Sequence, residues 1–290
     1  MAFPALLGLL VFQYLPMAGI YIAFVDYRPV RGVFGSQWTG LHNLDFLFRS
    51  GDAWRITFNT VFMNSLFIVA TLVTALALAL MLNELRDRWK WLTRFYQSVL
   101  FLPYFFSYVI VSYFAMAFLD PDRGLVNHGL GALHMGQHNW YATPGYWPVI
   151  LTIVAVWKTV GFWVIVYTAG ILAIDPQLLE AAQIDGAPKW RQVYNVILPM
   201  LAPLIVVQVL LSIGNIFRAD FGLFYLVTNN STLLYPRTDV IDTYVYRSLT
   251  QFGDIGMASA AGVYQCVVGF VLVLLANWLV RRRSPENALY

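Results

Sequence analysis

Charged residues and cysteines are both scarce in this chain, and each scarcity excludes a class of protein. Only 11% of the 290 residues are Asp, Glu, Lys or Arg, against about 25% in an average soluble domain. Cys266 is the single cysteine, so no disulfide forms within the chain and a dithiol redox centre is excluded. No Gly-x-x-x-x-Gly-Lys-Ser/Thr sequence occurs, so the chain is not a P-loop ATPase.

Groups suited to catalysis or metal binding are few and scattered. No constellation of serine, histidine and acid stands out, and Asp120 and Asp122 flank a proline as in a turn. His134 and His138 have a spacing that would bring both imidazoles to one face of a helix, but no acidic or cysteine ligand is near and glycines interrupt the segment. We therefore expect neither a catalytic site nor a metal site.

Apolar residues are abundant instead, with 59% of the chain hydrophobic and 17% aromatic. Because a helix rises about 1.5 Å per residue, roughly 20 apolar residues cross a hydrocarbon core of about 30 Å. Several stretches are long enough, and they lack the alternation of β-barrel strands. The sequence predicts an all-α polytopic membrane protein, one transmembrane domain over residues 1–290, with six membrane helices at about 2–24, 57–82, 95–118, 147–173, 200–217 and 257–280.

The basic residues orient these spans. The net charge of +3 is modest and the basic residues form no single patch, so nucleic-acid binding has no support. They are densest in the loops after the second and fourth spans and in the tail: Arg86, Arg88, Lys90, Arg94, Lys189, Arg191, Arg281, Arg282 and Arg283. By the positive-inside rule, both termini are predicted to be cytoplasmic. The first span lacks the basic region and cleavage site of a signal peptide, and its abrupt start leads us to expect a longer natural amino terminus.

Residues 174–199, between the fourth and fifth spans, carry the clearest local signals. Asp175 is a good N-cap with Pro176 at the first helical position. Gly186 supplies a left-handed residue that ends this helix, and Pro188 opens the next one. A stripe at helical spacing then follows: Trp190, Val193 and Ile197. The segment is predicted to be a rigid pair of short cytoplasmic helices.

Three motifs in this segment, Glu180-Ala-Ala182, Asp185-Gly-Ala187 and Leu198-Pro199, resemble the EAA loop of permease subunits in binding-protein-dependent ABC importers. The three motifs match at eight positions with fixed spacing, which is more than the capping of two helices would require. The resemblance implies that this EAA loop (residues 174–199) docks on a separate ATPase subunit through a defined set of residues: Glu180, Ala181, Ala182, Asp185, Gly186 and Ala187.

The same resemblance implies a transport subunit rather than an enzyme. The chain itself would bind no cofactor, because ATP and Mg would be bound by the partner ATPase. The expected partners are a second, homologous permease subunit, two ATPase subunits and a periplasmic or extracellular sugar-binding protein, with membrane lipid around the spans. The expected location is the bacterial inner (plasma) membrane, which the chain would cross several times.

Weaker matches along nearly the whole chain narrow the resemblance to carbohydrate importers, of the oligosaccharide and polysaccharide type that includes the first permease subunit of the alginate importer. The matching stretches are Tyr14–Gly19, Ala23–Tyr27, Gly40–Asn43, Asn59-Thr60, Leu102-Pro103, Gly124–Asn127, Trp157–Phe162, Thr238–Tyr246 and Ala260–Gln265. Leu179, where relatives often have tyrosine, and the missing basic segment before the first span are departures. The resemblance implies a pathway for oligosaccharides, acidic ones such as alginate fragments being expected and neutral ones the alternative.

Two other classes remain as alternatives. A secondary transporter would need broken helices or a repeat together with an ionisable coupling site at mid-membrane, and the EAA loop would have no purpose in it. A membrane scaffold or receptor would need no polar cavity. Association with an ATPase would distinguish the importer from both.

Lys158 is the one charge deep in a span, about 16 Å from its start at 1.5 Å per residue. It either lines the sugar pathway as a counter-charge or serves the architecture through an ion pair or by snorkelling. Asn215, Arg218 and Asp220 cluster at the end of the fifth span, and a saccharide pathway needs such hydrogen-bonding groups in a wet cavity. Further candidates have suitable side chains but serve equally well as bonds between helices: Tyr113, Gln208, Gln265, Asn64 and Tyr225.

Overall fold

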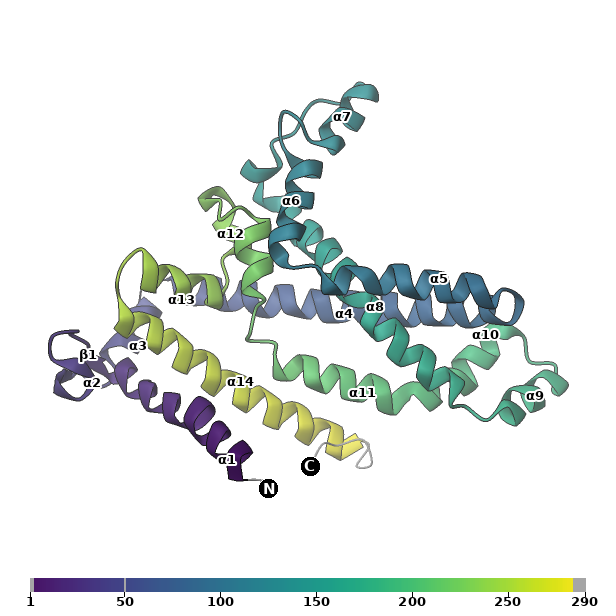
Figure 1. The fold of residues 1–290 in the computed structure, drawn as a ribbon, viewed down its shortest axis with the longest axis horizontal. Coiled ribbons are helices and arrows are strands. Elements are labelled where there is room, and N and C mark those ends of the chain that lie inside the picture. The colour runs from purple at the N-terminus through teal and green to yellow at the C-terminus, as the bar shows by residue number, and fades with distance from the viewer. Residues whose placement is uncertain (1–2, 50, 284–290) are drawn as a thin grey trace.

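The computed structural model describes residues 3–49 and 51–283, and almost all of their regular structure is helical (Figure 1). The α-helices are α1 Phe3–Leu9, α2 Gly32–Gly35, α3 His42–Arg49, α4 Asp52–Arg88, α5 Lys90–Phe101, α6 Tyr108–Leu119, α7 Leu125–Ala132, α8 Trp147–Leu172, α9 Pro176–Ile184, α10 Lys189–Gln192, α11 Leu198–Gly214, α12 Tyr235–Thr238, α13 Ile241–Thr250 and α14 Ile255–Arg283. Two short strands, β1 Val25–Asp26 and β2 Gln37–Trp38, pair antiparallel with Val25 opposite Trp38.

Within the described part of the chain, five helical segments are long and apolar enough to cross a membrane: Phe3–Phe24, Asp52–Arg86, Pro144–Leu172, Lys189–Gly214 and Ile255–Arg282. A bent pair, Lys90–Phe105 with Tyr108–Leu119, accounts for the sixth span. The all-α polytopic fold is therefore confirmed. The predicted start of the first span, Ala2, lies outside the described residues.

The 37-residue helix α4 runs nearly the whole length of the fold (Figure 1). Near its carboxyl end lie α9 and α10, which belong to the EAA loop, and at its amino end lie α3 and α13 (Figure 1). We call these the EAA-loop end and the far end. α4 packs along α8 in the interior of the fold. Each of the three buried apolar clusters contains residues of α4 together with residues of helices that are distant from it in sequence. A single stiff helix thus connects the two ends.

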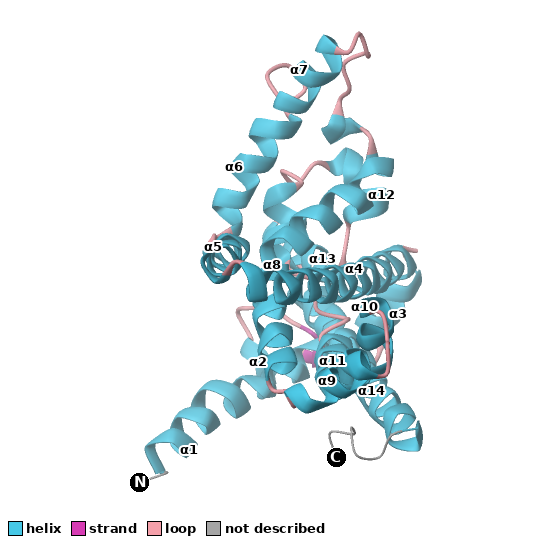
Figure 2. Cartoon of the chain, turned by 90° about the vertical axis from the view of Figure 1, so that its right-hand side faces the viewer, coloured by secondary structure: helices cyan, strands magenta, loops and turns pink. Residues whose placement is uncertain are grey.

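The third predicted span, residues 95–118, is not one helix. Its two parts are bent by 103°, and α6 and α7 project from α4 as an arm (Figures 1 and 2). Pro103 lies in the 3-10 turn Leu102–Phe105 that ends the first part, and Ser107 is the N-cap of α6, its hydroxyl accepting a hydrogen bond from the Ile110 N–H at 3.4 Å. A proline that removes a donor and a new N-cap shortly after it account for the break.

Lys158 stabilises this break. Its Nζ donates hydrogen bonds to the carbonyl oxygens of Tyr104 at 3.0 Å and Phe106 at 2.6 Å. A broken helix at membrane depth leaves carbonyls without partners, and an ammonium group both satisfies them and is itself satisfied. Lys158 also lies 5.0 Å from the centre of the Tyr108 ring. These contacts are architectural, one of the two roles that the sequence left open, and a role of Lys158 in the sugar pathway stays a prediction.

Gly161, one turn after Lys158, allows α8 to cross α5 at backbone contact. A Cβ atom on Gly161 would overlap the carbonyl group of Leu100 and lie 2.7 Å from the Cα of Phe101. The two backbones touch at this point, so no side chain fits between them.

We expect Gly161→Ala to destabilise the folded chain by about 1–3 kcal/mol, because the methyl group forces α5 and α8 apart. Gly129→Ala in α7 is the matched control, since its Cβ would meet nothing within 4 Å and alanine favours the helix. Thermal unfolding in detergent measures both. Equal melting temperatures for the two variants would contradict the close crossing.

The first span and the fifth span differ from regular α-helices. After α1 the first span continues as a π turn, Leu10–Tyr14, and a 3-10 helix, Leu15–Phe24, and its most apolar window contains no buried residue. Figure 2 shows α1 extending away from the other helices. The fifth span was predicted to end at residue 217, but α11 ends at Gly214 and an irregular segment follows.

Candidate functional site: the EAA loop and the polar segment after the fifth span

The EAA loop begins with the cap that the sequence predicts. The Asp175 side chain accepts a hydrogen bond from the Gln177 N–H at 3.0 Å, and Pro176 is the first residue of α9. The aspartate satisfies a free amide and its charge favours the positive end of the helix. The start of α9 is therefore fixed locally.

α9 ends in a Schellman motif centred on the Asp185-Gly-Ala187 sequence. Gly186 has a φ of 73°, the Ala187 N–H donates to the Ala182 carbonyl at 2.9 Å, and the Gly186 N–H donates to the Gln183 carbonyl at 3.0 Å. This pair of bonds requires a left-handed residue, which glycine adopts without steric cost. The glycine predicted to end this helix is confirmed.

Three contacts make the loop rigid and attach it to the spans. The buried Gln192 side chain donates to the Ala187 carbonyl at 2.8 Å, bracing the turn between α9 and α10. Lys189 forms an ion pair with Glu84 near the carboxyl end of α4 at 3.2 Å. α10 continues through the π turn Val193–Ile197 directly into α11. Leu179 on α9 also packs against the apolar cluster that includes Leu82 of α4 and Leu201 of α11, so the loop is joined to both membrane helices.

The predicted stripe of Trp190, Val193 and Ile197 is only partly correct. Ile197 is buried, but the Trp190 side chain is 65% exposed. A π turn has more residues per turn than an α-helix, so a stripe at α-helical spacing does not stay on one face through it.

The surface of the EAA loop is apolar and lacks cover from this chain. Ile184 is 87% exposed, and Leu178, Trp190 and Tyr194 are also exposed. Glu180 is exposed among them and takes part in none of the ion pairs found in the described residues. Ala181, Asp185 and Gly186 are exposed as well, while Ala182 and Ala187 are partly buried. An exposed apolar patch around a carboxylate is suited to a protein partner with a basic group.

The second candidate region is the irregular segment Asn215–Asp220, which follows α11. Asn215 donates from its side chain to the Leu211 carbonyl at 3.0 Å and so caps α11. Asn215, Arg218 and Gln265 line a cavity of about 630 Å³ between α14, the end of α11 and the first span, and Cys266 also faces it. The structure thus brings together three of the nine predicted pathway residues.

Side chains from three other helices bind the backbone of this segment. The Asn64 side chain donates to the Ile216 carbonyl at 2.8 Å, and Gln265 Nε2 donates to the Phe217 carbonyl. Asp242 Oδ2 accepts a hydrogen bond from the Ala219 N–H at 2.8 Å. Burial raises the pKa of the Asp242 carboxyl, while its hydrogen bonds with Ala219 and Gln265 act in the opposite direction. Asp242 was not among the residues selected from the sequence.

Asp220 lies in a separate polar group near the break in the third span. Its carboxylate accepts a hydrogen bond from the Tyr108 hydroxyl and attracts the Lys158 ammonium. Lys158 and Asp220, predicted separately, therefore belong to one cluster with Tyr108. This cluster joins α6, α8 and the segment after α11.

The remaining predicted pathway residues have different surroundings. Gln208 is 1% exposed and its Oε1 accepts a hydrogen bond from the Tyr167 hydroxyl, which is the alternative that the sequence left open, a bond between helices. Tyr113 is 67% exposed on α6. Tyr225 stacks on Phe221 with ring centres 4.8 Å apart. These three residues do not line the cavity described above.

The segment assessed for metal binding and the acidic pair assessed for catalysis have clear local structures. Residues 134–138 follow α7 and are not helical, so the i,i+4 spacing of His134 and His138 does not bring their rings to one face. Asp120 is a turn residue, as predicted, because its Oδ1 accepts hydrogen bonds from the Asp122 and Arg123 N–H groups at 3.0 and 2.8 Å, and these bonds lower the pKa of its carboxyl. Over the described residues, no group of three or more potential ligands is found.

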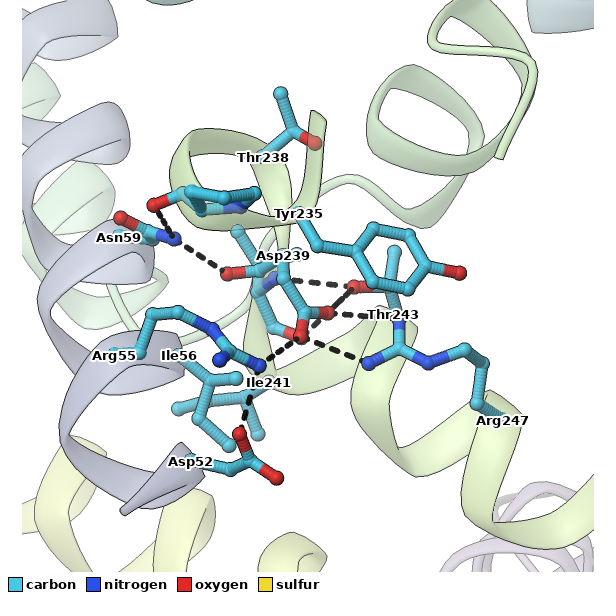
Figure 3. Close-up of polar contacts among 12 residues, drawn as sticks. Asp52, Arg55, Ile56, Asn59, Tyr235, Thr238, Asp239, Ile241, Thr243 and Arg247 are labelled. Atoms are coloured by element: carbon cyan, nitrogen blue, oxygen red, sulfur yellow. Dashed lines mark hydrogen bonds and ion pairs between the residues drawn. The ribbon is translucent and has the colours of Figure 1, made fainter. Parts of the chain in front are cut away.

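A buried ionic network at the far end, missed in the sequence, joins α4 to α13 (Figure 3). Asp239 accepts two hydrogen bonds from Arg247, both of 2.8 Å, and one from Arg55 at 3.2 Å. Asn59 donates to the Asp239 carbonyl at 3.0 Å, and Thr60 accepts from the Ile241 N–H at 3.1 Å. We call these residues the far-end clasp. Asn59-Thr60 and the stretch from Thr238 to Tyr246 were noted as motifs, but nothing in their sequence showed that they meet.

Comparison with known proteins places this architecture in a family. The model of the "Binding-protein-dependent transport system inner membrane component" family matches residues 72–285. The polygalacturonan/rhamnogalacturonan transport system permease protein YteP of Bacillus subtilis is 34% identical over 287 residues, covering 99% of this chain and 88% of that protein. Protein LplB of the same organism is 32% identical, covering 98% of this chain and 88% of that protein.

A solved structure shows the same fold. It is that of a bacterial ABC transporter involved in the import of the acidic polysaccharide alginate, in which the matching chain has a TM-score of 0.88 and 33% identity, with 97% of this chain and 93% of that chain covered. The same transporter in complex with alginate pentasaccharide-bound periplasmic protein matches equally well. This chain therefore belongs to the family of inner membrane components of binding-protein-dependent transport systems, as a permease subunit and not an enzyme.

Proposed function

We propose that this chain is one of two membrane subunits of an ATP-driven importer that carries oligosaccharides, acidic ones in preference, across the bacterial inner membrane. The observation that carries the proposal is the EAA loop, which is exposed at its surface and rigidly joined to α4 and α11. An element of this kind converts movement of a docked ATPase into movement of the spans. ATP and Mg would be bound by that ATPase.

The preference for acidic cargo has two supports. The polygalacturonan/rhamnogalacturonan permease and the alginate transporter are named for polymers of acidic sugars or polymers that contain them. In this chain, Arg218 is an exposed cation beside a cavity that also has amide groups from Asn215 and Gln265. A guanidinium binds a carboxylate through paired hydrogen bonds, and amides bind hydroxyl groups.

A second permease subunit would complete the pathway. The first span has no buried residue in its most apolar window, and α1 stands apart from the other helices (Figure 2). We propose that a homologous subunit and lipid cover this surface, that two ATPase subunits dock on the EAA loops of the pair, and that a sugar-binding protein delivers cargo at the far end. Both termini would then be cytoplasmic, as the basic residues indicate.

Transport follows by alternating access. ATP binding would close the ATPase pair, the two EAA loops would move together, and the cavity would change from inward-facing to outward-facing. Hydrolysis would reset it. A secondary transporter fits less well, because Lys158, the candidate for a coupling charge, is bound to backbone carbonyls.

Reconstitution of the chain with its companion permease, ATPase and binding protein in proteoliposomes tests the proposal. We expect acidic oligosaccharides bound to the binding protein to stimulate ATP hydrolysis more strongly than neutral ones. Selective stimulation by neutral oligosaccharides would overturn the acidic preference. Failure to form any complex with an ATPase would overturn the importer itself.

A further inference from the structure

The segment Asn215–Asp220 is not α-helical and has only short turns in its backbone, and three side chains from three helices bind that backbone. Asn64 on α4 holds the Ile216 carbonyl at 2.8 Å, Gln265 on α14 holds the Phe217 carbonyl, and Asp242 on α13 holds the Ala219 N–H at 2.8 Å. In a membrane protein, irregular backbone persists where protein groups satisfy it, and the three side chains do so here.

Two of these contacts are made to the residues on either side of Arg218 in the sequence. Phe217 comes directly before it and Ala219 directly after it, and the two side chains that hold them are themselves joined, Gln265 Nε2 donating to Asp242 Oδ2 at 3.2 Å. The backbone of Arg218 is thus fixed from both sides, while its side chain stays exposed beside the cavity. Such an arrangement positions a guanidinium without using its donors.

Asp242 also reduces the positive electrostatic potential around the Arg218 guanidinium. The two groups attract each other, but Arg218 takes part in none of the ion pairs in the described part of the chain. Its donors therefore remain available to a ligand, whereas its positive potential is reduced by a partly buried carboxylate. A transport pathway requires this balance, since a site must bind cargo well enough to admit it and weakly enough to release it.

We propose that Asp242 is a positioning residue that sets the strength with which Arg218 binds the carboxylate of an acidic sugar unit. This inference rests on the proposed function, that the chain carries acidic oligosaccharides. Asp242 holds the backbone beside Arg218 and reduces the positive potential of its guanidinium, so cargo is held loosely and passes on. Neutral oligosaccharides, which lack the carboxylate, are indifferent to this charge.

The test uses the complete importer with Asp242→Asn, Arg218→Gln and the double variant, and measures KM and kcat for uptake of an acidic and a neutral oligosaccharide. Asparagine keeps an acceptor for the Ala219 N–H and removes the charge. For D242N we expect the KM of the acidic sugar to fall about threefold to tenfold, kcat to fall with it, and the KM of the neutral sugar to stay within about twofold. For R218Q we expect the acidic KM to rise about tenfold or more.

The double variant decides whether Asp242 acts through Arg218. If it does, the acidic KM of the double variant equals that of R218Q, because the charge of Asp242 then has no cation to balance. An effect of D242N that persists without Arg218 would overturn the proposal. An equal change of KM for acidic and neutral sugars in D242N would also overturn it, because a loosened structure affects both cargoes alike. Asn64→Leu is the control for such loosening, since it frees the Ile216 carbonyl without a change of charge, and we expect it to change both KM values equally.

Two further results separate this inference from the proposed function. If the unaltered importer takes up neutral but not acidic oligosaccharides, the proposed function fails. If it takes up acidic ones and R218Q impairs both cargoes equally, the proposed function stands and the role of Arg218 and Asp242 is overturned. Arg218 is exposed, so R218Q leaves the fold intact and supplies this answer even when D242N lowers the yield of complex.

Discussion

Replacement of Asp239 by alanine is expected to destabilise the far end of the fold by about 3–5 kcal/mol, because it leaves a buried charge without its partner. The Asp239 side chain is fully buried, and the Arg247 side chain that binds it through two hydrogen bonds is only 8% exposed. Thr243 also donates to Asp239, at 3.0 Å. After the substitution, the Arg247 guanidinium would keep its contacts with two aromatic rings, its central carbon lying 4.2 Å from the centre of the Tyr235 ring and 6.0 Å from that of Tyr244, but would have lost its carboxylate.

The consequence extends beyond one ion pair, since the far-end clasp joins α13 to α4 (Figure 3) and an apolar cluster at the same end packs both helices against the start of α14. We expect D239A to accumulate poorly and to melt well below the unaltered chain in detergent. Asp45→Ala is the matched control: Asp45 forms an exposed ion pair with Arg49 at 2.8 Å, and such pairs contribute about 1 kcal/mol or less. Similar melting temperatures for the two variants would show that the clasp is dispensable.

The fold was largely predictable because long apolar runs leave a membrane chain few choices. The predicted spans at 57–82 and 147–173 agree with α4 and α8 to within a few residues, apart from polar extensions of α4 at both ends. The break in the third span was not predicted, because the sequence is free of charge on both sides of Phe106 from residue 95 to residue 118. Its cause includes Lys158, which lies 52 residues away from Phe106 in the chain.

The candidate site was predictable where the determinants are local. Asp175 and Gly186 act on amides within five residues of themselves, so their functions could be inferred from sequence alone. The far-end clasp depends on Arg55 meeting Asp239 from 184 positions away, and no local pattern shows this. Gln265 was selected as a pathway candidate with a bond between helices as the alternative, and its hydrogen bonds to the Phe217 carbonyl and Asp242 are of the second kind.

Gly186→Val is expected to weaken coupling between ATP hydrolysis and uptake while the membrane domain stays folded. Valine at a φ of 73° costs about 1–2 kcal/mol and disfavours the Schellman motif that orients α9 against α10. The exposed surface formed by Glu180, Ile184 and Trp190 would then no longer be presented as one rigid unit. Since about 1.4 kcal/mol corresponds to a tenfold change, we expect ATP-driven uptake to fall about fivefold to thirtyfold.

Gly253→Val separates this effect from general strain. Gly253 has a φ of 65°, and a Cβ atom at either glycine would meet nothing within 4 Å, so the two substitutions impose similar local costs. Gly253 lies between α13 and α14, at the opposite end of the fold from the EAA loop. Copurification of the ATPase and the rate of uptake in proteoliposomes are measured for both variants. If the EAA loop is the docking element, only G186V loses the ATPase; equal losses would mean that backbone strain alone, at either end of the fold, disrupts the complex.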